Sequence, residues 1–300
     1  MTEEAPSTPS QWRNFHTRVP IKACRLRSDD FKRLYRLIDQ RQKEYRDKAV
    51  QLLFRQEKET EEEFVQKKKR ITDAFVVSVT IAGENGELLT GNREEVFDEL
   101  NLPSEIKSIL YSTQSVPNAV LGHLPSDRIV LFLDFSRPPF LDFSRMPSLP
   151  TPNESNFEIS ANTEVWFAAA KAMLGDFFEN KRTGYEWLHR NSIYDLMLWF
   201  IVFPVALWIC ARTGNVYSGI NKLSTFPRLA IYSYLFLGCL VIYRILFSYS
   251  RWVFPKIEME REGGRRSPFR HRVVWGAIVL AIVLPALYDI VKQAVFVVLG

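Results

Sequence analysis

The chain has 300 residues and carries 39 Lys and Arg against 34 Asp and Glu, which gives a formal net charge of +5. This length allows one modest globular domain and a small helical bundle, and the mild positive charge favours lipid headgroups over nucleic acid as an anionic partner. Three cysteines, Cys24, Cys210 and Cys239, have neither the number nor the spacing of a disulfide framework or a zinc site.

Residues 1–27 are predicted to form a disordered N-terminal tail, because residues 1–20 are rich in Pro, Ser and Thr. The first residues are acidic and no apolar core follows them, which is not the pattern of a secretory signal. We therefore expect the region before the first apolar segment to be cytoplasmic.

Residues 28–73 contain no Gly or Pro and predict one long, charged amphipathic helix. Phe31, Ile38, Tyr45 and Leu52 recur every seven residues and form an apolar seam. Two interpretations stay open. In the first, the helix is a coiled-coil arm that binds a partner or another copy through residues 29–72. In the second, it packs on its own domain and its second half is solvated.

Residues 74–190 predict a cytoplasmic α+β domain with a small, mainly antiparallel sheet, because β-branched and apolar runs alternate there with turn residues. A turn at 83–87 is expected to return the chain into a second strand. The last helix is expected to begin after Asn162 or Thr163. The predicted strands are 75–81, 88–90, 106–112, 129–135 and 157–161, and the predicted helices are 93–100 and the segment after 163.

A repeat inside this domain is the most unusual local feature of the sequence. Leu-Asp-Phe-Ser-Arg occurs at 133–137 and again at 141–145, joined and followed by prolines. Prolines stiffen an extended chain, so the sequence predicts a protein-docking loop; the alternative is an irregular loop whose aromatic rings pack back on the domain. The candidate partner-binding residues are Asp134, Phe135, Arg137, Phe140, Asp142, Phe143 and Arg145.

Three apolar segments follow: Ile193–Ala211, Leu229–Phe247 and Val273–Val291. A helix of about 20 residues spans roughly 30 Å of hydrocarbon, and the first two segments are free of charge over most of their length. Several such runs in one stretch disfavour the alternative, which is buried helices of a large soluble domain. We therefore predict a three-span membrane domain at 191–300.

Basic residues near the spans predict the orientation. The loop between the second and third segments is much richer in Arg and Lys than the loop between the first and second, and positive loops stay on the cytoplasmic side. The N-terminal domain is therefore expected in the cytoplasm, and the C-terminus on the outer side.

Ionisable groups inside a membrane are functional candidates, and Asp289 and Lys292 lie one helical turn apart in the third segment. Their position near the outer end of that segment favours a mutual ion pair. Pro204 and Pro285 interrupt the first and third segments, which is common in membrane helices.

Motifs of known chemistry are absent from the sequence. It contains no P-loop, nucleophile elbow, zinc-protease motif or Cys-x-x-Cys pair, and its four histidines are scattered. We therefore expect no catalytic residue, metal or cofactor.

The expected α+β domain, the apolar spans and their orientation point to a multi-pass membrane protein. It would tether a cytoplasmic interaction or sensor module to the bilayer. It would act as a scaffold, receptor or assembly factor for an unidentified cytoplasmic protein, and it could form homo-oligomers. Two alternatives remain: an oligomeric pore-forming membrane effector gated by the cytoplasmic domain, and an enzyme with an unrecognised site.

Overall fold

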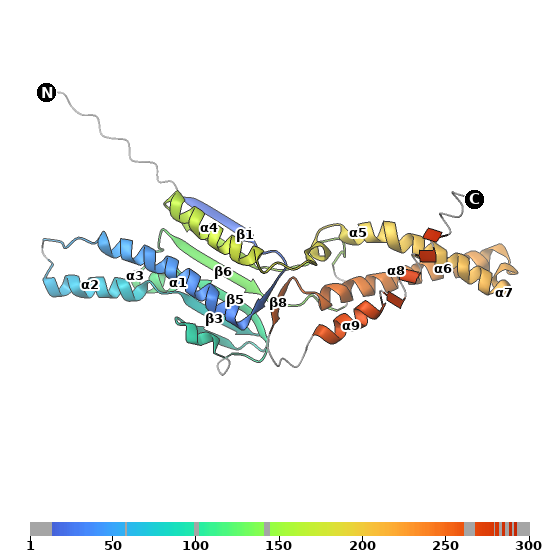
Figure 1. The fold of residues 1–300 in the computed structure, drawn as a ribbon, viewed down its shortest axis with the longest axis horizontal. Helices are drawn as coiled ribbons and strands as arrows, with labels where there is room; N and C mark the ends of the chain where they lie inside the picture. Colours follow the sequence, from blue (N-terminus) through green and yellow to red (C-terminus); the bar gives the residue numbers. More distant parts are fainter. Residues whose placement is uncertain are drawn as a thin grey trace, which may run out of the picture. The chain divides into compact units, whose positions relative to one another are not determined.

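The computed structural model describes residues 14–57, 59–98, 102–140, 145–260 and 268–278, together with positions 280, 281, 284, 285, 288, 289, 291 and 292 (Figure 1). The chain divides into two compact units. Unit 1 comprises residues 1–136, 153–182 and 257–261, and unit 2 comprises residues 137–152, 183–256 and 262–300.

Unit 1 is built around an antiparallel sheet, which confirms the predicted α+β class. Among the described residues the sheet has six strands in the order β1-β7-β6-β5-β3-β4, and each pairing is antiparallel. Buried and half-buried residues alternate along β6, as expected for a sheet with one face on the core. The strands are β1 (Phe15–Pro20), β3 (Ser78–Gly83), β4 (Leu88–Gly91), β5 (Ile106–Ser112), β6 (Arg128–Asp134) and β7 (Asn156–Ala161).

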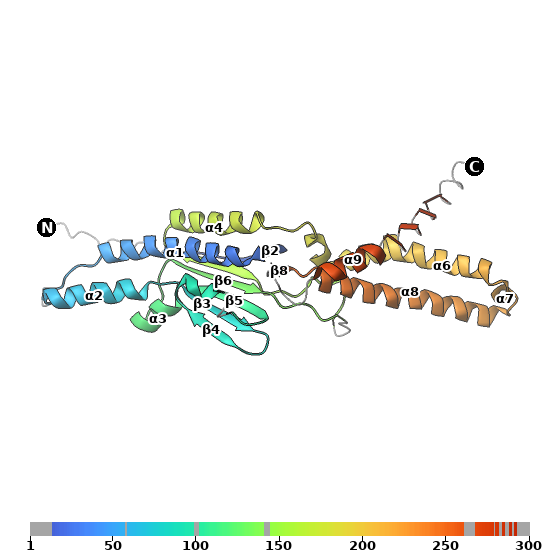
Figure 2. The same cartoon turned by 60° about the horizontal axis from the view of Figure 1, so that its bottom comes forward.

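Two helices, α1 (Ser28–Gln51) and α4 (Glu164–Glu179), lie side by side over one face of this sheet (Figure 2). Arg33 of α1 places its guanidinium carbon 5.8 Å from the ring centre of Phe177 of α4. Between sheet and helices lies one apolar core, which is the part of the molecule where burial stabilises most. Its fully buried members include Phe31, Leu34, Ile38, Val79, Ile81, Ile109, Tyr111, Leu131, Leu133, Ile159 and Leu174.

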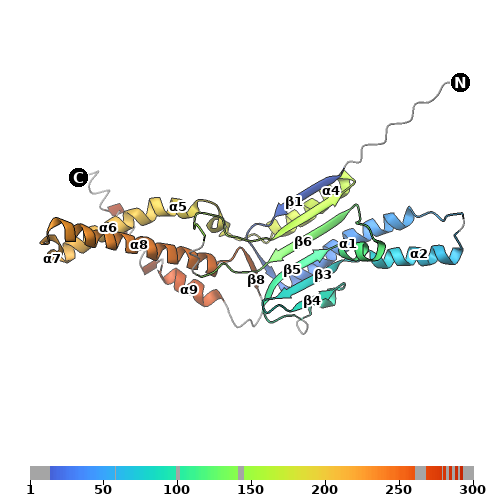
Figure 3. The same ribbon diagram turned by 180° about the vertical axis from the view of Figure 1, so that it is seen from behind.

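The prediction of a single long helix at 28–73 is wrong. α1 ends at Gln51, and a second helix, α2 (Glu61–Ala74), follows beside it as a hairpin (Figures 1 and 3). The Thr60 side chain accepts the Glu63 backbone N–H, and Glu63 accepts that of Thr60, so a capping box starts α2. Phe31 and Ile38 are buried in the core, whereas Leu52 lies exposed at the turn of the hairpin.

The predicted N-terminal tail 1–27 is also corrected, because β1 and β2 (Cys24–Arg27) lie in its second half. β1 completes one edge of the main sheet, and β2 pairs in parallel with β8 (Ile257–Glu260). Ion pairs from Arg25 to Glu258 and from Arg27 to Glu260, each 2.9 Å long, accompany this pairing. A strand that follows the second apolar segment by sequence is therefore part of unit 1.

Shorter elements complete the described part of unit 1. The predicted helix at 93–100 is a single 3₁₀ turn, η1 (Glu94–Phe97), and α3 (Ser115–Leu121) was not predicted. Gly122 ends α3 with a φ of 74°, a backbone conformation that favours glycine.

Unit 2 contains two helices that are long and apolar enough to cross a membrane, Ile193–Val216 and Thr225–Val253. The prediction of three spans is therefore corrected to two among the described residues. Of the third segment, α9 (Pro268–Ile278) is helical, and several positions of 273–291 lie outside the described residues. The remaining helices of the unit are η2 (Glu186–His189), α5 (Ile193–Met197), η3 (Leu198–Val202), α6 (Phe203–Val216), α7 (Ser218–Asn221) and α8 (Thr225–Val253).

The first apolar helix contains a π-helical segment, η3, directly before Pro204. Proline lacks the N–H that an α-helix needs and clashes with the preceding turn, and a local widening of the helix accommodates both effects. The interruption expected at Pro204 therefore takes the form of a π-helical turn that leaves the helix continuous.

The two apolar helices pack through a short seam of aromatic and small residues. Tyr243 stacks on Tyr194 with ring centres 4.8 Å apart, and its hydroxyl donates to the Tyr194 carbonyl at 2.8 Å. Further along, a Cβ on Gly214 would clash with the hydroxyl of Tyr232, so glycine permits close approach there. The other apolar side chains of both helices are for the most part exposed or half-buried, with Phe200, Phe226 and Tyr234 among the most exposed.

Candidate functional site

The Leu-Asp-Phe-Ser-Arg repeat is divided between the two units. Asp134 and Phe135 of the first copy belong to unit 1, whereas Arg137, Phe140 and Arg145 belong to unit 2. Asp142 and Phe143 lie outside the described residues. The division between the units thus falls within the first copy, between Ser136 and Arg137.

Asp134 and Phe135 act as structural residues of unit 1. The Asp134 carboxylate accepts the backbone N–H of Ser136 at 2.9 Å and that of Glu154 at 3.2 Å, and it also accepts the Ser136 hydroxyl. Phe135 is buried and meets Phe31 edge-on, with ring centres 5.8 Å apart. Phe135 thus packs in the core of unit 1, and the half-buried Asp134 carboxylate is held by local hydrogen bonds.

The rest of the loop is attached to the C-terminal turns of α8. Phe140 meets the rings of Tyr249 and Trp252 edge-on, at 5.4 and 6.2 Å between centres. The guanidinium carbon of Arg137 lies 5.3 Å from the centre of the Trp252 ring, a cation–π contact.

The same loop is attached to the start of the first apolar helix. Ser192 donates its backbone N–H to the Ser148 carbonyl at 2.8 Å, and the Ser148 hydroxyl donates to Asp195 at 2.7 Å. Residues 137–140 and 145–152 thus join the ends of both apolar helices within unit 2. We call these residues the collar.

A buried histidine lies where the collar meets η2 and α8. His189 is 5 % exposed, and its Nδ1 lies 2.9 Å from the Thr151 hydroxyl of the collar. Burial, and then the nearby positive charges of Arg251 and Lys256, lower the pKa of His189 from 6.5 to about 4. The imidazole is therefore neutral at physiological pH and serves as a packing and hydrogen-bonding group.

Arg251 supports this region from α8. Its side chain is buried, its Nε donates to the Leu188 carbonyl at 3.2 Å, and its guanidinium carbon lies 4.6 Å from the ring centre of Phe247. A buried arginine needs such partners, because an isolated buried charge is strongly unfavourable.

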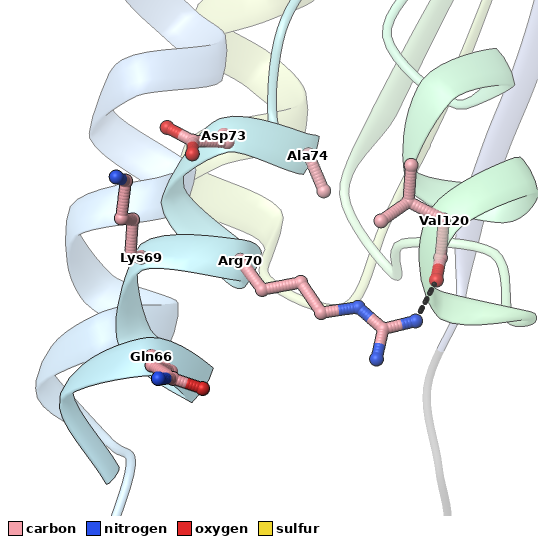
Figure 4. Close-up of a pocket in the computed structure, with 6 residues that line it drawn as sticks. All are labelled: Gln66, Lys69, Arg70, Asp73, Ala74 and Val120. Atoms are coloured by element: carbon pink, nitrogen blue, oxygen red, sulfur yellow. Dashed lines mark hydrogen bonds between the residues drawn. The ribbon is translucent and has the colours of Figure 1, made fainter. Parts of the chain in front are cut away.

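Unit 1 contains a groove of about 340 Å³ between α2 and α3. Arg70 of α2 crosses it and donates to the Val120 carbonyl of α3 at 2.9 Å (Figure 4). The arginine thus serves to join the two helices, and the groove brings together no nucleophile with a base. Its lining residues are Gln66, Lys69, Arg70, Asp73, Ala74 and Val120. Within the described parts of the chain, no three His, Cys, Asp or Glu side chains are placed to hold a metal ion.

The polar candidates of the third segment have a different arrangement from the one expected. Asp289 pairs with Arg212 of α6 at 3.2 Å rather than with Lys292, which is exposed. The carboxylate and the guanidinium are both partly exposed, as expected for an ion pair at the end of a helix.

Sequence reasoning missed the residues that hold the collar, namely Thr151, His189, Tyr249, Arg251 and Trp252. One signal could have found three of them, because aromatic and basic residues cluster at the end of the second apolar segment, which is typical of a membrane–water interface. His189 and Thr151 had no such signal, since their contact depends on the path of the loop. Comparison of the chain with protein-family models, with curated proteins and with solved structures finds no match.

Proposed function

We propose that this protein is a membrane-anchored interaction or sensor module, which holds unit 1 at a bilayer and acts as a scaffold, receptor or assembly factor. The observation that carries the proposal is the exposure of the two long apolar helices. Only 6 % of the most apolar window of each is buried within the chain. A core helix of a soluble protein would be mostly buried, so a bilayer is the solvent that suits this surface.

The connectivity of unit 1 supports a hairpin that enters and leaves the membrane on one side. Residues 153–182, which precede the first apolar helix, and residues 257–261, which follow the second, belong to the same compact unit. Two helices that begin and end at one folded unit cross the bilayer an even number of times. With the basic loop that follows α8, this favours a cytoplasmic unit 1.

The turn of the α1–α2 hairpin supports a role in binding a protein partner. Leu52 is 72 % exposed and Phe54 80 % exposed, and Val65 of α2 is also exposed. Large apolar side chains grouped at the end of a helical hairpin are typical of interaction surfaces. We infer that this turn, rather than the Leu-Asp-Phe-Ser-Arg repeat, binds the cytoplasmic partner.

The test uses the full chain in nanodiscs with a photo-crosslinking residue at position 54. We expect a discrete crosslinked partner from a cytoplasmic extract, lost in a Leu52→Ser/Val65→Ser double variant. A Leu88→Ser/Leu124→Ser double variant is the matched control, because both leucines are exposed elsewhere in unit 1, and it should retain the crosslink. Crosslinking that is unchanged by the first double variant would contradict the assigned surface.

Ion flux from proteoliposomes and the mass of the solubilised protein by light scattering separate this proposal from the pore-forming alternative. We expect no flux above that of empty vesicles. A conducting, discrete oligomer would overturn the proposed function in favour of the effector.

A further inference from the structure

The collar leaves an unusual set of large apolar side chains exposed. Met146 is 74 % exposed and Leu149 51 %, and Phe140 and Trp187 are nearly half exposed. Backbone hydrogen bonds connect the collar to Ser192 and to the carbonyl of His189. These bonds keep the segments that carry the exposed side chains next to one another. Single exposed apolar residues need no explanation, but a group on connected segments marks a binding surface.

The position of the group indicates what covers it. The collar is attached to the last turns of α8 and to the first residues of α5, so it lies where both apolar helices end. At that level a membrane changes from hydrocarbon to headgroups, and aromatic rings and arginines are the side chains that suit this layer. Trp252, Tyr249 and Phe140, in mutual contact, form such an aromatic cluster.

The charge of the same region is positive. Among its described residues, Glu186 and Asp195 are outnumbered by basic residues. Glu186 lies 3.7 Å from Arg190, whose side chain stays 64 % exposed, and the Asp195 carboxylate accepts the Ser148 hydroxyl. The basic residues are Arg137, Arg145, Arg190, Arg244, Arg251 and Lys256. An excess of arginine beside a membrane helix attracts acidic lipids, since guanidinium groups bind phosphate well.

We propose that the collar is a lipid-binding surface, which inserts Phe140, Met146 and Leu149 into the headgroup layer and binds anionic phospholipid headgroups through Arg145 and Arg190. The inference rests on the membrane anchoring proposed above and goes beyond it. The loop that carries the sequence repeat would then contact lipid instead of a protein partner, and the lipid composition of the membrane would set how firmly the collar is held.

The first test measures depth in the bilayer. Nitroxide labels are placed at Met146→Cys and Leu149→Cys in the full chain carrying Cys210→Ala and Cys239→Ala, reconstituted in vesicles of phosphatidylcholine mixed with phosphatidylglycerol. Leu88→Cys, at 74 % exposure in unit 1, is the aqueous control, and Leu237→Cys of α8 is the membrane control. We expect the collar labels to be several-fold less accessible than Leu88 to a water-soluble nickel chelate, and more accessible to oxygen.

The second test measures lipid preference and needs no cysteine variants. Spin-labelled phosphatidylglycerol should associate more strongly with the reconstituted protein than spin-labelled phosphatidylcholine. Arg145→Gln/Arg190→Gln should reduce this preference by on the order of tenfold, because each juxtamembrane charge contributes to it. Lys107→Gln/Lys171→Gln removes the same charge from exposed positions of unit 1 and should leave the preference unchanged.

The outcomes separate the two proposals. Collar labels as accessible to nickel as Leu88, with Leu237 deep in the membrane, would overturn the lipid-binding collar and leave the anchor standing. Collar labels shielded from both oxygen and nickel would indicate a protein contact and also overturn it. A preference unchanged by the arginine substitutions would overturn the headgroup assignment. A Leu237 label that is open to water would overturn the proposed function itself.

Discussion

The two units of this protein differ in how much of their apolar surface the chain itself buries. Unit 1 buries its large apolar side chains against one another between a sheet and two helices. Unit 2 has a small buried cluster formed by Leu188, Tyr194, Tyr243 and Phe247, and it leaves long apolar faces exposed. The first unit therefore carries its own core, whereas the second depends on the surrounding medium to cover its surface.

This difference implies that the same kind of apolar substitution lowers stability by different amounts in the two units. In unit 1 a lost methyl group leaves a cavity, because the neighbours are fixed by close packing. On the exposed faces of unit 2, a similar loss is filled by lipid or detergent. Stability in unit 2 is then concentrated in the few groups that the chain itself buries.

The largest expected effect is in the sheet of unit 1. Leu131 of β6 is fully buried, so Leu131→Ala should lower the free energy of unfolding by about 2 to 5 kcal/mol. Leu237→Ala, on the exposed face of α8, should change it far less in detergent. Denaturant titration of both variants measures the contrast, and equal losses would break the comparison between the units.

The pH dependence of unit 2 should depend on His189. Its folded pKa of about 4 lies below the unfolded value near 6.5, so the unfolded state binds more protons between these values. Stability is full above pH 6.5 and falls as the pH is lowered toward 4, by about 2 kcal/mol at pH 5.

His189→Gln should remove this decrease, as measured by thermal unfolding in detergent at pH 7 and pH 5. His123→Gln, at an exposed position of unit 1, is the control and should keep it. The same decrease in both variants would show that another group titrates.

The next largest effect is expected for a substitution that weakens the pairing of β2 with β8. The Glu258 side chain is 7 % exposed and pairs with Arg25, whereas Glu260 is 45 % exposed and pairs with Arg27. Glu258→Gln should destabilise the two-stranded sheet by about 1 to 3 kcal/mol, because a charged hydrogen bond is lost in a buried place.

Hydrogen exchange of the amides in β2 and β8 should therefore accelerate in Glu258→Gln. Glu260→Gln should have little effect on it, since solvent screens an exposed pair. Faster exchange in Glu260→Gln than in Glu258→Gln would show that burial does not decide the strength of this contact.

The smallest expected effect lies within the hairpin of unit 2. Tyr243 is buried and donates its hydroxyl to the Tyr194 carbonyl, so Tyr243→Phe should cost about 1 kcal/mol. Tyr234, on the same helix, is exposed, and Tyr234→Phe should be close to neutral. Thermal unfolding in one detergent compares the two variants directly.

The main sheet could be predicted where the signal was local. β5 has the bounds that its run of β-branched and aromatic residues predicts. β6 is shifted by one residue at both ends, and β7 begins one residue earlier than predicted. The break between α1 and α2 was missed because no Gly or Pro marks it. Thr60 and Glu63 do mark it, since Thr-x-x-Glu is a sequence signature of a helix start.

The strands β2 and β8 could not be predicted from local pattern. Their sequences, Cys-Arg-Leu-Arg and Ile-Glu-Met-Glu, are short and half charged. Each strand depends on the other, distant in sequence, for a parallel partner and for the opposite charge. Thr151 and His189 were unpredictable for a similar reason, since they meet only after the loop has folded.

The distance between β2 and β8 in the sequence has a consequence for how the protein is made. Arg25 and its partner Glu258 are 233 residues apart, which corresponds to roughly 10 to 50 s at the rates at which ribosomes elongate a chain. During that interval both apolar helices are synthesised while β2 has only its contacts with residues 181 and 182 and still lacks β8. Unit 1 is thus completed only after both apolar helices have been synthesised.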